Sequence, residues 1–273
     1  MMKAFLRVLE LNGGIMDGLV SIVMPSYNCE KFIAESIESV QAQTYREWEL
    51  LIVDDCSTDC SVQIVQQYAL NDKRIKIYQN NKNSGAAISR NYALQEARGR
   101  WIAFLDSDDL WVKTKLEKQI EFMEENNYHF SFTSYTQVDE EGKELHIRMT
   151  GPKSVGKIKI HMFNFFGCLS VMYDAKATGL IQIANLKKRN DYAIWLKVSK
   201  YAKAYLLDED LAVYRVRSGN SLSDRNKGMS QWLEYHYKLF RIGQGYNSVT
   251  SAFLTVGNVF FYEIKKLLYQ KKY

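Results

Sequence analysis

The sequence contains few residues that break a chain or cross-link it. Two prolines, Pro25 and Pro152, occur among 273 residues, and no proline- or serine-rich linker divides the chain. The four cysteines lack the paired CxxC spacing of a zinc site, so we interpret them as reduced thiols. With 47% hydrophobic and 25% charged residues, the composition excludes disordered and fibrous proteins and indicates one large globular domain.

Long hydrophobic runs are also missing. The longest apolar stretch, VTSAFLTVGNVFFY, has 14 residues, fewer than the roughly 20 that span a bilayer. The N-terminal segment MMKAFLRVLELNGG has no sustained apolar core and no small-residue cleavage site, so we expect no signal peptide and a cytoplasmic protein. Residues 1–18 precede the first predicted strand, and we expect them to be an N-terminal extension or the product of a misassigned start.

The positive charge is concentrated near the C-terminus. Residues 226–273 hold seven basic and two acidic side chains, whereas residues 1–225 hold 29 of each, so this segment carries the whole net charge of +5. Two interpretations remain open. Residues 229–273 form either a basic, aromatic, amphipathic helix on an anionic membrane or a helix pair that packs on the main domain or in a homodimer. Nucleic acid is not an expected partner, because no known binding motif accompanies these residues.

Short apolar runs alternate with helical patterns in the first half of the chain. Helical spacing of apolar residues lies between the runs, at residues 33–40, 62–69 and 86–97. This alternation predicts an α/β fold with a parallel sheet and crossover helices. The predicted buried strands are residues 20–24, 48–54, 74–78 and 101–106.

Each predicted strand is followed by a polar segment: PSYN, DDCSTD, NNKNSG and DSDD, in chain order. In such sheets ligands bind beyond the carboxyl ends of the strands, so these segments are the candidate site. The first segment contains neither G-x-G-x-x-G nor the P-loop pattern. A nucleotide would therefore be held by an aromatic ring and carboxylates instead of a glycine-rich cradle.

The fourth segment contains a D-x-D pattern, Asp106 and Asp108, directly after a strand. In extended geometry the two carboxylates point to the same side, where they favour a divalent cation such as Mg²⁺ or Mn²⁺ with a diphosphate ligand. The alternative is that residues 106–109 are the N-cap and first-turn acids of a helix that begins LWVKTK, which is our interpretation of Asp109. For Asp106 and Asp108 the three-residue pattern alone leaves both interpretations open.

The second segment begins with Asp54 and Asp55. A carboxylate at this strand end can accept the imide N–H of uracil, while Tyr27 in the neighbouring segment can stack on the ring. The alternative is a turn with a helix N-cap, which we favour for Asp54.

Several of these motifs occur together and in order. The stretch VSIVMPSYNCEKFIAESIESVQAQTYREWELLIVDDCSTD, followed by NNKNSGAAISRNYALQEARGRWIAFLDSDDLW, strongly resembles the family 2 glycosyltransferases. Within that family it looks most like bacterial enzymes of the teichuronic acid, capsule or lipopolysaccharide type. The resemblance implies a GT-A fold with a Rossmann-like, mainly parallel sheet over residues 19–225, followed by a helical C-terminal extension at residues 226–273.

The resemblance also assigns roles on the donor side. Pro25 and Tyr27 match positions that contact the nucleotide, and Asp55 matches the carboxylate that binds uracil. Asp106 and Asp108 match the motif that binds Mn²⁺ or Mg²⁺ and the nucleotide-sugar, with Asp108 as the more direct metal ligand.

Three further residues are placed near the donor by the same resemblance. Gly85 permits close backbone approach, and Arg90 is positioned to meet phosphate or sugar, although a helix-surface arginine is nearly as compatible with the pattern. The stretch YRVRSGNSLS, residues 214–223, matches a segment that closes over the donor in the family. From it we take Arg217, in preference to Arg215, as a diphosphate contact.

The acceptor side has one matching motif, in KRNDYAIWLKVSKYAKAY. Asp191 matches the family's general base, while the acid that usually precedes it is replaced by Asn190. The basic neighbours of Asp191 should keep it ionised. The alternative role for Asp191 is the N-cap of the helix that contains Trp195.

The resemblance therefore implies an inverting, metal-dependent hexosyltransferase. It would move a sugar from a UDP-sugar to a hydroxyl of a cell-surface polysaccharide or lipid-linked acceptor. Two alternatives remain. A sugar nucleotidyltransferase would carry a glycine-rich, basic first loop, which this chain lacks. A catalytically silent nucleotide-binding or scaffold protein is favoured only by Asn190.

Overall fold

The computed structural model describes residues 15–217 and 229–273, so residues 218–223 of the predicted donor-closing stretch lie outside it. The first half alternates strands and helices as the sequence predicts. Its elements are β1 (Met16–Ser26), α2 (Ile33–Gln41), β2 (Trp48–Asp54), α3 (Ser61–Asn71), β3 (Ile75–Gln79), α4 (Ala86–Glu96) and β4 (Gly99–Phe104).

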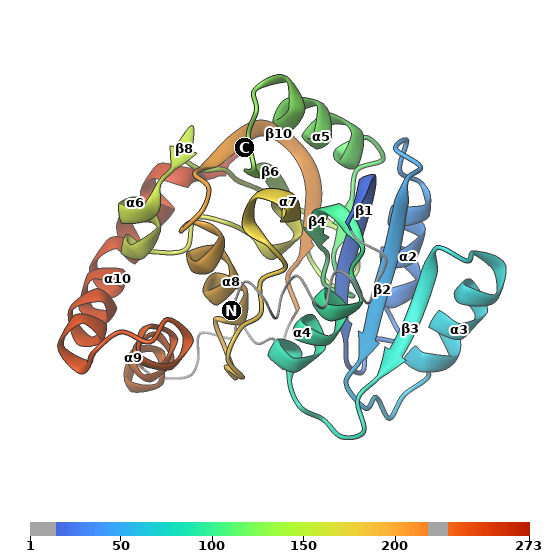
Figure 1. The fold of residues 1–273 in the computed structure, drawn as a ribbon, viewed down its shortest axis with the longest axis horizontal. Coiled ribbons are helices and arrows are strands. Elements are labelled where there is room, and N and C mark those ends of the chain that lie inside the picture. Colours follow the sequence, from blue (N-terminus) through green and yellow to red (C-terminus); the bar gives the residue numbers. More distant parts are fainter. Residues whose placement is uncertain (1–14, 218–228) are drawn as a thin grey trace.

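These four strands form the parallel part of the sheet, in the order β3-β2-β1-β4 (Figure 1). All seven residues of β2 are buried, which explains its uninterrupted apolar run. The prediction for β1 was too short, because the strand begins at Met16, which pairs with Gly99. Residues 16–18 therefore belong to the sheet and not to an N-terminal extension.

Beyond β4 the chain adds further strands to the same sheet, with helices between them. The order continues β4-β9-β6-β7-β11 with antiparallel pairs, and β10 runs parallel to β6. The α/β sheet is therefore mixed: its first half is entirely parallel, and its second half combines antiparallel pairs with the parallel pair of β6 and β10. The added elements are β5 (Leu110–Trp111), α5 (Lys115–Glu125), β6 (Phe130–Val138), β7 (Glu144–Met149), β8 (Ser154–Val155), α6 (Lys157–Met162), β9 (Val171–Asp174), α7 (Ala175–Thr178), α8 (Asn190–Val198) and β10 (Ala204–Arg215).

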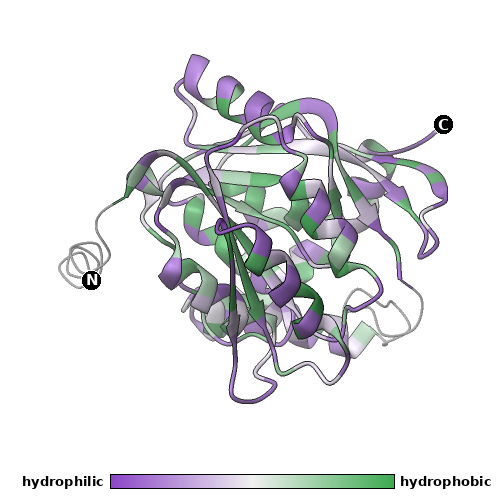
Figure 2. Cartoon of the chain, turned by 90° about the vertical axis from the view of Figure 1, so that its right-hand side faces the viewer, coloured by the Kyte–Doolittle hydropathy of each residue, from purple (hydrophilic) through white to green (hydrophobic). Residues whose placement is uncertain are grey.

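The sheet separates two hydrophobic cores. Leu50 and Ile52 of β2 face one core, whereas Leu51 and Val53 face the other, as strand alternation requires. Figure 2 shows hydrophobic colouring in the central strands and hydrophilic colouring on outward helix faces. Burial on both sides fixes the register of the strands, because a slip by one residue would exchange the two faces.

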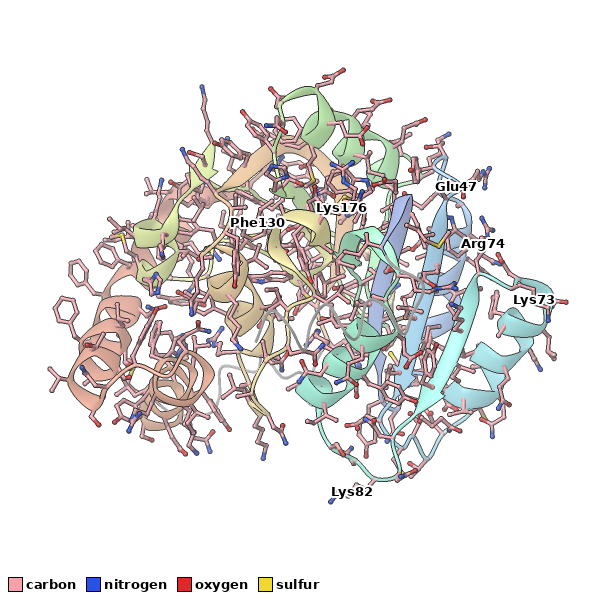
Figure 3. All side chains as sticks on the ribbon, viewed as in Figure 1. Glu47, Lys73, Arg74, Lys82, Phe130 and Lys176 are labelled. Carbon is pink, nitrogen blue, oxygen red and sulfur yellow. The ribbon has the colours of Figure 1, made fainter. Side chains whose placement is uncertain are left out.

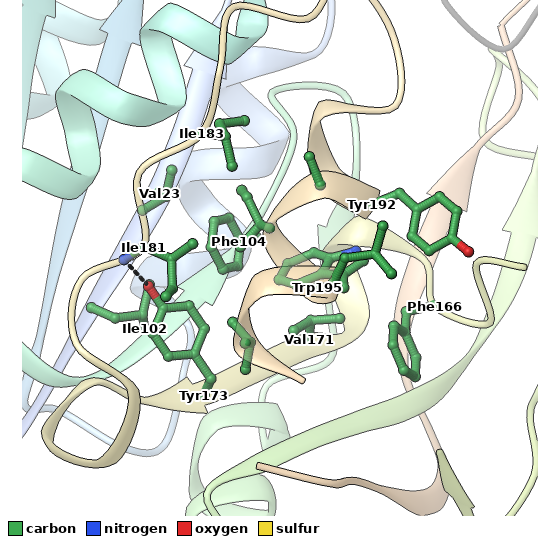
Figure 4. Packing of buried hydrophobic residues seen from close by; sticks show 14 of the residues in the cluster. Val23, Ile102, Phe104, Phe166, Val171, Tyr173, Ile181, Ile183, Tyr192 and Trp195 are labelled. Atoms are coloured by element: carbon green, nitrogen blue, oxygen red, sulfur yellow. Dashed lines mark hydrogen bonds between the residues drawn. The ribbon is translucent and has the colours of Figure 1, made fainter. Parts of the chain in front are cut away.

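One aromatic contact in this core brings the second half of the chain to the end of β4. The ring of Trp195, in α8, meets Phe104 edge-on at 4.9 Å between centroids (Figure 4). Phe104 is the last residue of β4 and lies two residues before Asp106. Trp195 follows Asp191 by four residues, so this packing holds the N-terminal turn of α8 near the D-x-D segment.

The C-terminal segment is helical and lies at the side of the molecule opposite β3 and α3 (Figure 1). It consists of α9 (Met229–Lys238), the π-helical turn η2 (Leu239–Gly243), α10 (Ser248–Tyr269) and β11 (Gln270–Lys272). The predicted helical extension is confirmed, and its last strand pairs with β7 at the edge of the sheet. Within residues 15–217 and 229–273, no helix has both the length and the hydropathy needed to cross a membrane.

Candidate active site

The candidate site lies beyond the carboxyl ends of β1, β2 and β4. The register pairs Ser26 with Asp54 and Val23 with Phe104, so the segments that follow the three strands begin side by side. The amide of Asp55 also donates to the carbonyl of Ser26 at 2.8 Å, which extends the pairing past the strands. The sheet thus brings together residues 25–28, 54–59 and 106–109.

The first loop presents an aromatic ring. Tyr27 is 46% exposed, whereas Pro25 before it is half-buried. Asn28 has a left-handed backbone (φ 47°), and its side-chain oxygen accepts the amide of Thr58 at 2.8 Å. This contact fastens the first loop to the second and leaves the ring of Tyr27 free to stack on a planar ligand.

The carboxylate of Asp55 organises the loop between β3 and α4. Its Oδ1 accepts from Asn80 at 2.7 Å and from the Ser84 amide at 2.8 Å, and its Oδ2 accepts from the Gly85 amide at 2.7 Å. A carboxylate has about four acceptor positions, so about one remains for a ligand. Uracil binding by Asp55 stays a prediction, and the structure adds a second role that the sequence did not indicate.

Gly85 lies at the turn into α4, with φ 90°, a conformation that residues with a side chain rarely adopt. A Cβ at this position would meet no atom within 4 Å, so the space in front of the backbone is open. Close approach of a ligand to this backbone stays a prediction. Lys82, in the same loop, projects away from the sheet beyond β3 (Figure 3).

Arg90 is the most constrained side chain of the site. It is 5% exposed, so it is not the helix-surface arginine that formed the alternative prediction. Its two terminal nitrogens donate to different partners, one to the side-chain oxygen of Asn190 and the other to the carboxylate of Asp106. Direct contact of Arg90 with phosphate or sugar stays a prediction. Such a contact would use the N–H groups of Arg90 that do not bond Asn190 or Asp106.

The charge state of Arg90 follows from its neighbours. Burial opposes the charge, but the carboxylates of Asp106 and Asp191 together with Cys168 raise the pKa of Arg90 above its ordinary value. The guanidinium therefore remains a fixed cation between the two halves of the site. Its Nε is buried and has no hydrogen-bond partner among the described residues.

The D-x-D segment precedes a helix without capping it. Helix α5 begins at Lys115 with Thr114 at the N-cap position, and the short strand β5 intervenes, so the N-cap interpretation of residues 106–109 is wrong. Asp109 is instead buried, and its carboxylate accepts the backbone amide of Arg215 at 2.9 Å. It joins the D-x-D segment to β10.

Asp106 and Asp108 form an acidic pair that two arginines only partly balance. Arg90 pairs with Asp106, and Arg217 pairs with the Oδ2 of Asp108 at 3.2 Å. Burial is the main cause that raises the pKa of Asp108, followed by the negative charge of Asp106. The positive charge of Arg217 therefore does not fully balance the negative charge of the Asp108 carboxylate. Hard carboxylate oxygens in this state fit a divalent cation.

A cation at this pair would need ligands beyond the protein. In the part of the chain that the structure describes, no group of three or more His, Cys, Asp or Glu side chains is arranged to hold a metal ion. Mg²⁺ and Mn²⁺ commonly take one or two carboxylates and complete their shell with water and phosphate oxygens. The donor set therefore fits a metal that arrives with a diphosphate.

Arg215 and Arg217 have different surroundings. The guanidinium of Arg215 is buried, donates to the Asp108 carbonyl at 3.1 Å and pairs with Glu35 at 2.5 Å, so it holds the loops together. Arg217 is less buried and reaches only the Asp108 carboxylate among the hydrogen bonds described. Contact of Arg217 with the diphosphate stays a prediction.

Asp191 lies in the first turn of α8, one residue after Asn190. The N-cap position belongs to Arg189, whose backbone is left-handed (φ 61°), so the N-cap interpretation of Asp191 is wrong. Its carboxylate is half-buried and accepts from the Asn164 side chain at 3.3 Å. The Asn164 carbonyl in turn accepts from Lys265 of α10 at 2.6 Å.

Sequence analysis did not identify Asn164 and Lys265. They lie 27 and 74 residues from Asp191, in segments without a recognisable motif, so no local pattern connects them with the site. All four cysteines are free thiols, as predicted.

A separate hollow of about 480 Å³ lies at the amino ends of the strands and includes Glu47 and Arg74 in its lining. Figure 3 shows these residues at the end of β2 and β3 opposite Lys82. Its charged groups pair with one another, for example Glu49 with Lys76 at 2.8 Å. We assign it no role in the site.

Comparison with known proteins agrees with this geometry. The family model described as "Glycosyl transferase family 2" matches residues 21–178. The chain is 43% identical, over 80% of its length and 87% of the relative, to "Putative teichuronic acid biosynthesis glycosyltransferase TuaG" of Bacillus subtilis. It is 41% identical, over 67% of its length and 71% of the relative, to "UDP-Glc:alpha-D-GlcNAc-diphosphoundecaprenol beta-1,3-glucosyltransferase WfgD" of Escherichia coli.

Solved structures show the same fold. Residues 1–349 of TarS from S. aureus, in complex with UDP-GlcNAc, superpose with a TM-score of 0.69 at 23% identity. The match covers 91% of this chain and 74% of that one. The expected GT-A fold is thereby confirmed.

Proposed function

The chain belongs to glycosyltransferase family 2, and from that premise we propose that it transfers a sugar from a UDP-sugar, with inversion, to a hydroxyl of a cell-surface polysaccharide or lipid-linked acceptor. The names of two relatives support this choice of substrates, since one refers to teichuronic acid biosynthesis and the other to UDP-glucose and a diphosphoundecaprenol acceptor. We further propose that residues 19–225 carry out the transfer and that residues 226–273 serve the acceptor side.

One observation carries the proposal. Arg90 donates at the same time to Asp106 of the D-x-D segment and to Asn190, the neighbour of Asp191. Residues 106 and 190 are far apart in the sequence, yet a single buried guanidinium joins them. The carboxylate that we propose as a metal ligand and the carboxylate that we propose as the proton acceptor are thus held close together, which supports sugar transfer.

On the donor side, Asp106 and Asp108 would hold Mn²⁺ or Mg²⁺ together with the diphosphate. A bound divalent cation offsets the charge of the diphosphate and makes it a better leaving group. Arg217, paired with Asp108, is placed to exchange that carboxylate for a phosphate oxygen. The uracil ring would stack on Tyr27 beside Pro25 and take the remaining acceptor position of Asp55, with the backbone at Gly85 close to the ligand.

On the acceptor side, Asp191 takes the proton of the attacking hydroxyl. Inversion needs a single base opposite the leaving group, and Asp191 is the acid on the α8 side of Arg90. Asn164 orients its carboxylate by donating to Oδ2. Asn190 does not act as an acid, and its side chain keeps Arg90 in place instead.

The test begins with titration of UDP into the full chain with and without Mn²⁺, repeated on Asp108→Ala. We expect binding that depends on Mn²⁺ and is lost in the variant. A screen of UDP-sugars for transfer or slow hydrolysis then follows, with Asp191→Asn as a variant that binds UDP but does not turn over. Absence of UDP binding under every condition would reject the proposal and favour the silent scaffold.

A further inference from the structure

The buried side of α10 combines polar residues with Leu254, Phe261 and Tyr269, which pack against the core. Three polar residues, Ser251, Thr255 and Asn258, are 0%, 4% and 1% exposed. Their groups are satisfied internally, since Thr255 donates to the Ser251 carbonyl at 2.7 Å and Asn258 donates to the His161 carbonyl at 2.7 Å. The buried side of α10 is thus more polar than that of an ordinary surface helix, which turns a mainly apolar face inward.

The exposed side of α10 is apolar. At about 100° per residue, six exposed side chains fall within a sector of about 80° and extend over roughly 27 Å of helix. We call this set the outer stripe. Its members and their exposed fractions are Val249 (81%), Phe253 (77%), Val256 (64%), Phe260 (69%), Ile264 (37%) and Leu267 (85%).

An exposed apolar stripe of this length marks an interaction surface. The charges around it indicate which one. The end of α10 and the following strand carry Lys266, Lys271 and Lys272, against one acidic residue, Glu263, in the same region, while Lys265 points inward to the Asn164 carbonyl. Pairing with a second copy would bring two such basic ends into one assembly, where like charges repel each other. An anionic lipid surface instead attracts these basic residues.

We propose that α10 docks this protein on an anionic bilayer, with the outer stripe in the acyl boundary and the helix in the plane of the interface. Docking does not require insertion across the bilayer, for which no helix in the described ranges is suited. The proposal depends on α10 and the basic strand β11 and not on the nucleotide site, so UDP binding and vesicle binding are measured separately and either one can fail without the other.

The test uses the full chain in co-sedimentation with phosphatidylcholine vesicles, with and without phosphatidylglycerol. We expect binding to the anionic vesicles that weakens with added salt. Phe253→Ser with Phe260→Ser should weaken it by at least about tenfold, because two aromatic rings no longer leave water. The matched control is Leu70→Ser on α3, which is 73% exposed at the other side of the molecule and should bind as the parent does.

Circular dichroism and UDP titration check that the variants remain folded. Lys271→Gln with Lys272→Gln should weaken binding to anionic vesicles by about tenfold and leave the outer stripe intact. Failure of the parent chain to bind anionic vesicles, or equal binding by the serine variant, would overturn the proposal. Light scattering that shows a dimer dissociated by Phe253→Ser with Phe260→Ser would assign the stripe to a second copy instead.

Discussion

Arg90 shows why a particular residue type is needed at the centre of the site. Its guanidinium is planar and presents donors in fixed directions, so it can satisfy Asp106 and Asn190 together. The Lys ammonium is a single point charge and cannot hold the same two acceptors in the same geometry. Arg90 is therefore a positioning residue that keeps the donor and acceptor sides in register.

Arg90→Lys should lower kcat by at least about 100-fold, because a small displacement between reacting groups has an effect of this size. UDP affinity should change by less than about tenfold, since Tyr27 and Asp108 are untouched. Titration of UDP and initial transfer rates with the selected UDP-sugar measure the two effects separately. The control is Arg98→Lys, whose side chain is 43% exposed and pairs with Glu49; it should transfer at the parent rate, and an equally active Arg90→Lys would contradict the positioning role.

Asn190 gives a second prediction. It stands where the family usually has an acid, yet its side-chain oxygen still accepts a hydrogen bond from Arg90. As an acceptor for Arg90 it can be replaced by another acceptor, so Asn190→Asp should keep kcat within about threefold of the parent. Asn190→Leu leaves the Arg90 donor unpaired in a buried site and should lower kcat by about tenfold or more. Transfer rates of the two variants decide this, and equal loss in both would show that the side-chain amide itself is required.

At the scale of elements, the parallel half of the fold could be predicted from the sequence because its signal is local. β2 was predicted at residues 48–54 and occupies them, and α4 lies within the predicted range 86–97. None of the strands after β4 was predicted, including the nine-residue β6 and the twelve-residue β10. β7, β8 and β11 are short or lie at the sheet edge and show no strong alternation. The start of α5 was misplaced because β5 inserts an extended segment before the helix.

The candidate site was predictable only in part, because sequence patterns indicate local structure and not contacts between distant segments. Residues at strand ends, such as Asp106 and Asp55, follow from the order of strands. The hydrogen bonds that give these residues their neighbours connect distant segments, and Lys265 and Asn164 carry no local pattern. Asn28 likewise bonds Thr58 in the next loop, a contact between two segments that no local pattern predicts.

Lys115, the first residue of α5, is a buried lysine that gives the element a pH dependence. Burial lowers the pKa of Lys115 to about 7, whereas in an unfolded chain it is about 10.4. At a pH between these two pKa values, Lys115 is protonated in the unfolded chain and neutral in the folded protein. The free energy of unfolding should therefore rise with pH in this range. Urea unfolding should show this group adding about 2 kcal/mol between about pH 7 and pH 9.

Lys115→Met should remove that increase, because the titrating group is gone while the side-chain length is kept. At neutral pH the variant also gains stability, because no lysine has to lose its proton on folding. Part of this gain is offset, since the Gln119 oxygen, which accepts from Lys115 at 2.7 Å, loses its partner. Lys118→Met is the control, since its side chain is 42% exposed and should leave the pH dependence unchanged. Parallel curves for the parent and Lys115→Met would refute the assignment.

At the scale of the whole molecule, α10 connects two surfaces with different roles. Its outward side carries the outer stripe, while Lys265 on the inward side donates to the Asn164 carbonyl and Asn164 donates to Asp191. The proposed membrane contact and the proposed base are thus linked by two hydrogen bonds. A lipid-linked acceptor would meet the base at a position that α10 helps to set.

Lys265→Met tests this link. Removal of the donor frees the segment around Asn164, so kcat should fall by about tenfold while UDP affinity and vesicle binding change little. Lys266→Met removes the same charge from the next position, 100° around the helix, and should keep the parent kcat. If both variants lose activity in parallel with vesicle binding, the effect is electrostatic attachment to the bilayer. A loss confined to Lys265→Met, in detergent as well as on vesicles, would show that α10 positions the base through Asn164.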